Sequence, residues 1–279
     1  MTARHPVLGV FDSGFGGLTV LEALRRRIPE ADFLYFGDTA RLPYGTKSAE
    51  TVARYAIAAA RFLEDRGAEM LVVACNTASA LALEPITRAM RIGVVGVVAP
   101  GAERAARASR SRKAVVIATE ATVASHAYRT VLATHGVQAY EKACPLLVPL
   151  VEEGWTEHPV TEQVARIYLE EAFGDESRGA DVLLLGCTHY PLLQPLIARV
   201  LAGVPADSVA IVDSADSTAD VVAQALRVHP LPPPSPEPER RNAPRVKCFA
   251  TDSVEKFRRI GERFVGHRLE DVTHVDLGG

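Results

Sequence analysis

Two cysteines occupy equivalent places in the sequence, each at the end of an apolar run that a helical pattern follows. Cys75 lies in MLVVACNTASA, and Cys187 lies in VLLLGCTHYPLL. Unpaired backbone N–H groups at the start of a helix carry partial positive charge, which lowers the pKa of a nearby thiol. Asn76, Thr77 and Thr188 can cap these helices or bind a substrate carboxylate. Buried core cysteines beside ordinary caps would explain either site alone, but the repetition favours a reactive pair.

Asp12 and Ser13 end the first apolar run of the chain, inside the segment DSGFGG. Its glycines, Gly14, Gly16 and Gly17, allow the backbone to approach a ligand closely, or they form a tight turn that needs glycine conformations. The spacing is not G-x-G-x-x-G and no P-loop lysine follows, which argues against a nucleotide site.

Three further polar features accompany these segments. His189 follows Cys187 by two positions and belongs to the residue type that titrates near neutral pH, although a lone histidine is more often structural. The loop DTARLPYG at 38–45 follows the second apolar run, where loops at the carboxyl edge of a sheet commonly face a ligand. Glu152 and Glu153 are adjacent acids, a pattern that is more typical of a solvated surface.

The chain offers no recognisable motif for a metal or an organic cofactor. None of its four cysteines forms a C-x-x-C pair, so we expect reduced thiols and no metal site. A pyridoxal-phosphate enzyme needs a Schiff-base lysine, and no lysine lies in such a motif, so we expect no cofactor. The lysines are Lys47, Lys113, Lys142, Lys247 and Lys256.

Length and composition indicate an ordinary globular protein. With 279 residues, 48% hydrophobic and 23% charged, the chain is expected to form about two domains. The net charge of −3 does not indicate the basic surface that nucleic-acid-binding proteins have. The N-terminus lacks the apolar stretch of a signal peptide, and no run of about 18 apolar residues occurs. We therefore expect a cytoplasmic enzyme without a nucleic-acid or membrane partner.

Short apolar runs alternate with helical patterns along the chain, which predicts an α/β fold with mostly parallel sheets flanked by helices. Strands are expected at 6–11, 32–36, 70–74, 92–98, 114–118, 182–185, 209–212 and 245–250, and helices at 18–27, 49–66, 78–90, 102–108, 123–135, 159–172, 192–201, 217–226 and 253–264. The similarity of the two cysteine segments, and a weaker similarity between VFDSG and IVDSA, indicate two similar domains. We place the first at 1–97 plus 208–279 and the second at 98–207. The Pro-rich segment 229–244 is expected to be a surface connector, with a polyproline ligand as the alternative.

Five motifs in this order resemble glutamate racemase, a member of the aspartate/glutamate racemase superfamily. They are GVFDSGFGGLTVL, YFGDTARLPYG, ACNTASA, CPLLVPLVEEG and GCTHYPLL, and they extend from about residue 8 to 215. The resemblance implies two α/β domains with the active site in the cleft between them. It also implies cofactor-independent exchange of L- and D-glutamate, which supplies D-glutamate for peptidoglycan.

The family pattern assigns roles to individual residues. Cys75 and Cys187 would be the two acid/base thiols, with Cys75 removing the proton from D-glutamate and Cys187 from L-glutamate. Asp12 would assist Cys75, and His189 with Glu152 would assist Cys187. The implied substrate contacts are Asp12, Ser13, Tyr44, Gly45, Asn76, Thr77, Thr119, Thr122, Thr188 and His189. The segment 118–122 departs from the pattern because Ala118 and Ala121 stand where the family usually has glycine.

The resemblance also bears on partners and alternatives. The family is frequently dimeric, so a homodimer is a possible state of this chain. An aspartate or broad-specificity amino-acid racemase of the same superfamily is the alternative enzyme. A non-catalytic amino-acid-binding module is the alternative of another class, and the presence of both cysteines and both polar partners argues against it.

Overall fold

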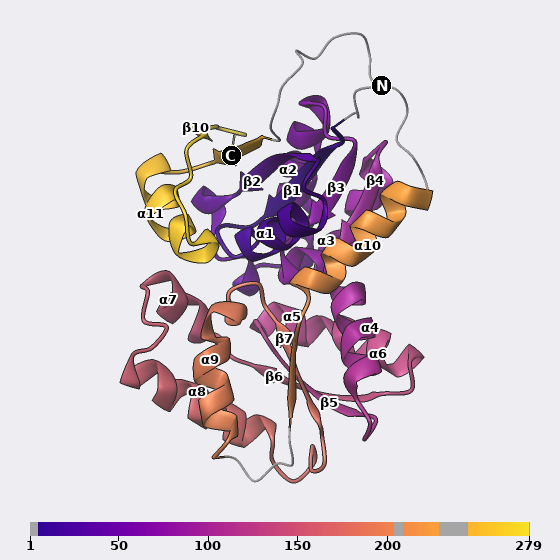
Figure 1. The fold of residues 1–279 in the computed structure, drawn as a ribbon, viewed down its shortest axis with the longest axis vertical. Helices are drawn as coiled ribbons and strands as arrows, with labels where there is room; N and C mark the ends of the chain where they lie inside the picture. Colours follow the sequence, from indigo (N-terminus) through magenta and orange to yellow (C-terminus); the bar gives the residue numbers. More distant parts are fainter. Residues whose placement is uncertain (1–4, 204–208, 229–244, 279) are drawn as a thin grey trace.

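The computed structural model describes residues 5–203, 209–228 and 245–278, and the predicted connector at 229–244 lies outside them. The described chain forms two sheets in which every paired strand is parallel. The larger has the order β10-β9-β2-β1-β3-β4, and the smaller has the order β6-β5-β7-β8. They lie one above the other along the long axis of the molecule (Figure 1). This arrangement confirms the predicted α/β class with two sheets flanked by helices.

We call the elements around each sheet the large-sheet unit and the small-sheet unit. The large-sheet unit comprises β1 (Val7–Asp12), α1 (Leu18–Arg27), β2 (Asp32–Gly37), η1 (Thr39–Arg41), η2 (Tyr44–Thr46), α2 (Ala49–Asp65), β3 (Met70–Val73), α3 (Asn76–Ala89), β4 (Gly93–Gly96), α10 (Ala215–Val228), β9 (Val246–Ala250), α11 (Val254–Val265) and β10 (Val272–His274). The small-sheet unit comprises α4 (Val98–Ala108), β5 (Lys113–Ala118), α5 (Glu120–Ser125), α6 (Ala127–Thr134), β6 (Gln138–Ala143), α7 (Leu147–Glu152), α8 (Pro159–Ala172), β7 (Val182–Gly186), η3 (Tyr190–Leu193), α9 (Gln194–Leu201) and β8 (Ala210–Asp213).

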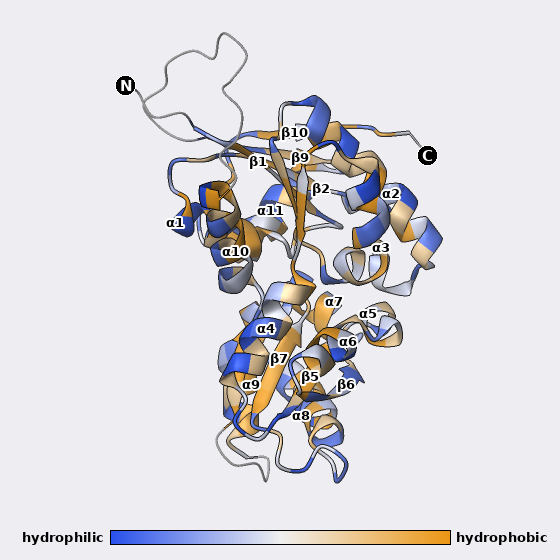
Figure 2. Ribbon diagram, turned by 90° about the vertical axis from the view of Figure 1, so that its right-hand side faces the viewer, coloured by the Kyte–Doolittle hydropathy of each residue, from blue (hydrophilic) through white to orange (hydrophobic). Residues whose placement is uncertain are grey.

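Local sequence explains where these elements begin and how they pack. Every residue of β3 (MLVV) and β7 (VLLLG) is buried, as expected for parallel strands covered on both faces. Ser48 caps α2 by accepting a hydrogen bond from the backbone N–H of Thr51. Pro159 opens α8, where a missing N–H costs nothing. Figure 2 shows the hydrophobic strands at the centre and helices with mixed polar and apolar faces around them.

The structure differs from the predicted elements at several places. The single helix expected at 123–135 is two helices, α5 and α6, because His126 adopts a left-handed conformation with φ 53°. The strands β6 and β10 were not predicted. In addition, β8 pairs with β7 in the smaller sheet. The sequence assigned this strand to the first domain, whereas its pairing joins it to the small-sheet unit.

The chain passes between the two units at Val97–Val98 and again at Ser214, and these two crossings are neighbours. A Cβ atom on Gly101, in the first turns of α4, would lie 2.9 Å from the Cβ atom of Ser214. One cluster of buried hydrophobic residues is continuous from Phe15 in the large-sheet unit to Tyr190 in the small-sheet unit. The carboxyl ends of the strands in both units therefore face a shared interior.

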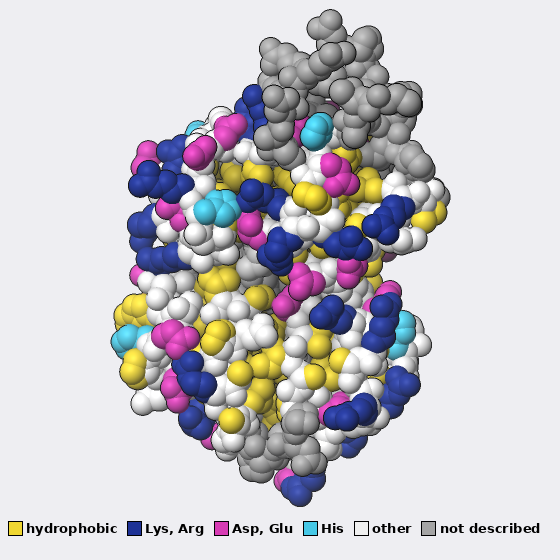
Figure 3. All heavy atoms as spheres, viewed as in Figure 1, with side chains coloured by type: hydrophobic (Ala, Val, Ile, Leu, Met, Phe, Trp, Pro, Cys, Tyr) yellow, Lys and Arg dark blue, Asp and Glu magenta, His cyan; other side chains and the backbone are white. Residues whose placement is uncertain are grey.

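The outer surface carries charges of both signs. On the face drawn in Figure 3, Lys and Arg side chains are interspersed with Asp and Glu. Among the residues that the structure describes, no helix combines the length and apolar character needed to cross a bilayer.

Candidate active site

Both predicted thiol sites converge on the DSGFGG turn that follows β1. On one side of the turn, Sγ of Cys75 lies 3.3 Å from Oγ of Ser13. On the other side, a Cβ atom on Gly16 would lie 2.4 Å from Nδ1 of His189, the neighbour of Cys187. The turn therefore separates two sulfur sites that are 112 positions apart in sequence, one from each unit.

Cys75 is buried, with 5% of its surface exposed, and it is itself the N-cap of α3. Its sulfur accepts a hydrogen bond from the N–H of Ala78 at 3.4 Å, so the prediction that Asn76 or Thr77 caps this helix was wrong. Burial, together with the charge of Asp12, raises the pKa of Cys75 to about 12, although Ser13 and the N–H of Ala78 act in the opposite direction. The expected lowering of this pKa by the helix start is outweighed, because burial penalises the thiolate more.

Asp12 is an acid whose charge acts on Cys75. Its carboxylate accepts hydrogen bonds from the N–H of Gly14 at 2.9 Å and from the hydroxyl of Tyr35 at 3.3 Å. Only 1% of Asp12 is exposed, and burial raises its pKa above the ordinary value. A carboxyl group with a raised pKa beside a thiol is suited to exchange protons.

Cys187, His189 and Glu152 form a continuous chain of contacts. Sγ of Cys187 lies 3.8 Å from Nδ1 of His189, and Nε2 of His189 lies 3.1 Å from Oε1 of Glu152. Burial lowers the pKa of His189, but the contacts with Cys187 and Glu152 outweigh it and raise the pKa to about 10. The imidazolium form, which donates at both ring nitrogens, is therefore favoured at neutral pH. The structure therefore brings these three side chains into contact.

The second cysteine lacks the helix start that the sequence predicted. The 3₁₀ helix η3 begins after His189, and its first turn has no side-chain cap. Thr188 is buried beside Gly16, and its backbone carbonyl accepts a hydrogen bond from the hydroxyl of Thr19 at 3.3 Å. The expectation that Thr188 caps a helix was therefore wrong. The charged imidazole, rather than a helix terminus, is the positive group beside Cys187.

Three threonine hydroxyls from the two units meet near the start of α3. Oγ1 of Thr77 lies 3.0 Å from Oγ1 of Thr119 and 3.3 Å from Oγ1 of Thr122, and the latter two are 2.9 Å apart. Thr119 caps α5, so the alanines around it leave both hydroxyls in place. These hydroxyls form a small polar cluster that can donate to a carboxylate.

Asn76 supplies an additional buried donor beside this cluster. Its Oδ1 accepts a hydrogen bond of 2.5 Å from the hydroxyl of Tyr128. Its Nδ2 is buried and has no hydrogen-bond partner among the described residues, although Asn76 is only 3% exposed. A buried amide donor of this kind normally has an acceptor, so Nδ2 is suited to bind a polar ligand.

Tyr44 and Gly45 lie in η2, which approaches the small-sheet unit. The hydroxyl of Tyr44 donates to Oδ2 of Asp38 at 2.6 Å, so this hydroxyl is already engaged within the protein. A Cβ atom on Gly45 would lie 3.0 Å from Cβ of Thr119. The backbone of this segment therefore borders the threonine cluster.

Sequence reasoning missed Tyr35 and Tyr128, which hold Asp12 and Asn76 respectively. Both are fully buried, and each lies in an ordinary-looking strand or helix. No local motif marks them, because their partners are 23 and 52 positions away.

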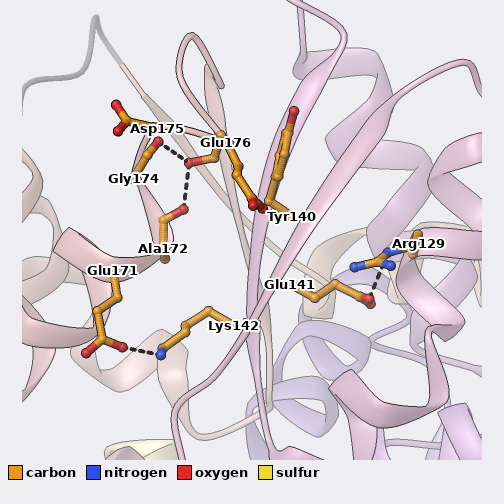
Figure 4. A pocket seen from close by; sticks show the side chains of 10 residues that line it. Arg129, Tyr140, Glu141, Lys142, Glu171, Ala172, Gly174, Asp175 and Glu176 are labelled. Carbon is orange, nitrogen blue, oxygen red and sulfur yellow. Dashed lines mark hydrogen bonds and ion pairs between the residues drawn. The ribbon is translucent and has the colours of Figure 1, made fainter.

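A separate pocket of about 300 Å³ lies beside the edge strand β6, between that strand and the end of α8 (Figure 4). Its two cations are each paired with a carboxylate, Lys142 with Glu171 and Arg129 with Glu141. The pairing leaves this pocket without an unpaired cation among the residues that line it. Among all the described residues, no group of three or more His, Cys, Asp or Glu side chains is arranged to hold a metal ion.

A family model described as Asp/Glu/hydantoin racemase matches residues 18–222, so the chain belongs to that family of racemases. The chain is 56% identical to the glutamate racemase of Koribacter versatilis, with 100% of both sequences covered. A crystal structure of glutamate racemase from Francisella tularensis in complex with D-glutamate has a TM-score of 0.86 at 34% identity and covers 98% of each chain. Within the racemase family, the chain therefore belongs with the glutamate racemases.

The similarity to aspartate racemases is limited to the fold. The aspartate racemase of Picrophilus torridus has a TM-score of 0.53 at 16% identity and covers 79% of this chain.

Proposed function

We propose that this protein interconverts L- and D-glutamate by transferring the Cα proton between two thiols. The observation that carries the proposal is the convergence of Cys75 and the Cys187–His189–Glu152 chain on the two sides of the DSGFGG turn. Full-length similarity to glutamate racemases supports glutamate as the substrate. D-Glutamate is the enantiomer that this family supplies for peptidoglycan.

Inversion at Cα explains why two thiols are needed. The proton leaves from one face of the carbon, and a proton from a second group must arrive at the opposite face. In the direction from L-glutamate, the thiolate of Cys187 removes the proton and the thiol of Cys75 delivers one. In the other direction the two sulfurs exchange roles, and each is left in the state that the reverse reaction requires.

The local environments suit these alternate roles. The imidazolium of His189 beside Cys187 stabilises a thiolate there, while the raised pKa of Cys75 favours its protonated form. Asp12 is placed to take up or return a proton at the Cys75 side.

The carboxylates of glutamate need donors rather than another acid. The hydroxyls of Thr77, Thr119 and Thr122 and the amide Nδ2 of Asn76 offer such donors, which is consistent with their proposed role as substrate contacts. Hydrogen bonds from these groups would also stabilise the charge that develops when Cα loses its proton. Their burial excludes water, which strengthens each interaction.

The experiment that tests this proposal is a circular-dichroism assay of purified protein after dialysis against a chelator and removal of pyridoxal phosphate. We expect L- and D-glutamate to be racemised, and aspartate to be turned over far more slowly. Comparable turnover of both amino acids would support the broad-specificity alternative. Activity that depends on added pyridoxal phosphate or divalent metal would contradict the two-thiol mechanism. Residence in the cytoplasm and a homodimeric state remain predictions.

A further inference from the structure

The helix α11 belongs to the large-sheet unit, yet it contacts His189 and Glu152, the proposed partners of Cys187, as well as Tyr35, which binds Asp12. Near the N-terminal end of this helix, Phe257 is fully buried. The ring of Phe257 lies 5.7 Å from that of Phe15 and 6.0 Å from that of Tyr35, whose hydroxyl donates to Asp12. This part of the helix is therefore anchored beside the Cys75 side of the site.

The other end of α11 reaches the Cys187 side. Phe264 is 9% exposed, and its ring lies 5.3 Å from the imidazole of His189 at an interplanar angle of 88°. An edge-to-face contact of this kind restricts rotation of the imidazole. His189 must keep Nδ1 toward Cys187 and Nε2 toward Glu152, so the orientation that Phe264 enforces is the one proton transfer requires.

Arg263, the neighbour of Phe264 in sequence, contacts Glu152, at the other end of the series Cys187–His189–Glu152. Its Nη1 donates to the backbone carbonyl of Glu152 at 2.8 Å. The guanidinium also lies over Gly154, which has a φ of +81° and whose Cβ position would be 2.7 Å from Nη1. A cation at the C-terminal carbonyls of α7 fixes the end of that helix and with it the Glu152 side chain. Figure 1 shows α11 directly above α7 across the boundary between the units.

We propose that Phe264 and Arg263 are positioning residues that hold the His189–Glu152 pair for proton transfer at Cys187. The inference rests on the proposed racemase function and adds a role for a helix outside the racemase motifs. It predicts an effect confined to one of the two proton transfers, because both side chains contact the partners of Cys187 and neither contacts Cys75.

Isotope effects separate the two transfers. The ratio kcat/KM must stay equal in the two directions because the equilibrium constant between enantiomers is one. If transfer at Cys187 slows, cleavage of the Cα–H bond becomes more rate-limiting from L-glutamate and less so from D-glutamate. We therefore expect the primary isotope effect with [2-²H]-L-glutamate to rise and that with [2-²H]-D-glutamate to fall toward one.

The experiment compares Phe264→Ala, Phe264→Leu, Arg263→Ala and Arg263→Lys, with Arg259→Ala as the control at an exposed position of the same helix. We expect Phe264→Ala and Arg263→Ala to lower kcat/KM by about tenfold and to shift the two isotope effects in opposite directions. Arg263→Lys, which retains the cation, is expected to recover most of the rate. Arg259→Ala should leave both isotope effects unchanged.

Thermal melting identifies any variant that fails to fold. Arg263 is exposed and Phe264→Leu keeps an apolar side chain, so these two positions test the inference even if Phe264→Ala is unstable. Equal changes in both isotope effects, or none, would overturn the positioning role while a racemising wild type leaves the proposed function intact. A wild type that does not racemise glutamate would overturn the proposed function itself.

Discussion

Gly16 and His189 approach each other so closely that no side chain fits between them. A Cβ atom on Gly16 would lie 2.4 Å from Nδ1 of His189, and it would be equally close to Oγ1 of Thr188. His189 cannot easily move away, because Cys187 and Glu152 hold its two ring nitrogens. The glycine is therefore required by the packing of one unit against the other.

Replacing Gly16 with alanine should displace His189 or the turn itself. We expect Gly16→Ala to lower kcat/KM by about a hundredfold, because a displacement of about 1 Å is enough to misalign a proton transfer. Gly93→Ala is a matched control, since the nearest atom to its Cβ position is 3.9 Å away. Steady-state kinetics and thermal melting of both variants check the prediction. Wild-type activity in Gly16→Ala would mean that the turn does not pack against His189 during catalysis.

The four buried cysteines should separate into two functional classes. Cys144 and Cys248 are 0% and 1% exposed and lie outside the two strand-end motifs, so their substitution by serine should change turnover by less than about tenfold through packing alone. Cys75→Ala and Cys187→Ala should abolish racemisation while glutamate binding, measured by calorimetry, persists. A robustly active Cys187→Ala variant would show that one thiol is sufficient.

Asp12 and His189 should affect opposite proton transfers. We expect Asp12→Asn to slow the step at Cys75 more and His189→Asn to slow the step at Cys187 more, because the charge of Asp12 acts on Cys75 and the imidazole of His189 contacts Cys187. In D₂O, the first D-glutamate formed from L-glutamate should carry deuterium at Cα, while recovered L-glutamate carries little. Primary isotope effects measured separately for each direction check the assignment. Identical shifts in the two variants would contradict it.

His189 should make the stability of the protein depend on pH in a defined window. Its pKa is raised from 6.5 to about 10 in the folded protein by Cys187 and Glu152, which outweigh the opposing effect of burial. A group whose pKa rises on folding stabilises the fold fully below its unfolded pKa, and this contribution is lost as pH rises through its folded pKa. We therefore expect the free energy of unfolding to decline between pH 6.5 and 10.

Urea unfolding at a series of pH values, in a reducing buffer, measures this decline. His189→Asn lacks the titrating group, so its curve should be flatter than that of the wild type across the same window. Parallel curves for the two proteins would mean that other groups cause the pH dependence.

The parts of the fold that the sequence predicted best are those with strong local patterns. The buried strands β3 and β7 are continuous apolar runs, and α1 and α8 follow their predicted bounds. The strand β6 (QAYEKA) was missed because it lies at a sheet edge, where charged side chains are normal and the apolar pattern disappears.

The candidate site was predictable only in its motif residues. Cys75, Cys187, Asp12 and His189 lie in recognisable segments, and the structure brings them to one turn. The direction of the pKa shift at Cys75 was not predictable, because it depends on burial by residues distant in sequence. Phe264 likewise belongs to an ordinary amphipathic helix until the fold places it against His189.

The hydrogen bonds between the two units have a kinetic consequence. Cys75 and Cys187 are only 5% and 6% exposed, so glutamate can reach them only after the units separate. Separation breaks the bonds of Thr77 with Thr119 and Thr122, of Tyr128 with Asn76, and of Arg263 with Glu152. Each such bond contributes about 1 kcal/mol, so together they favour the closed arrangement of the two units. Opening of the units, rather than diffusion of glutamate to the surface, is therefore expected to set the upper limit on the rate of association.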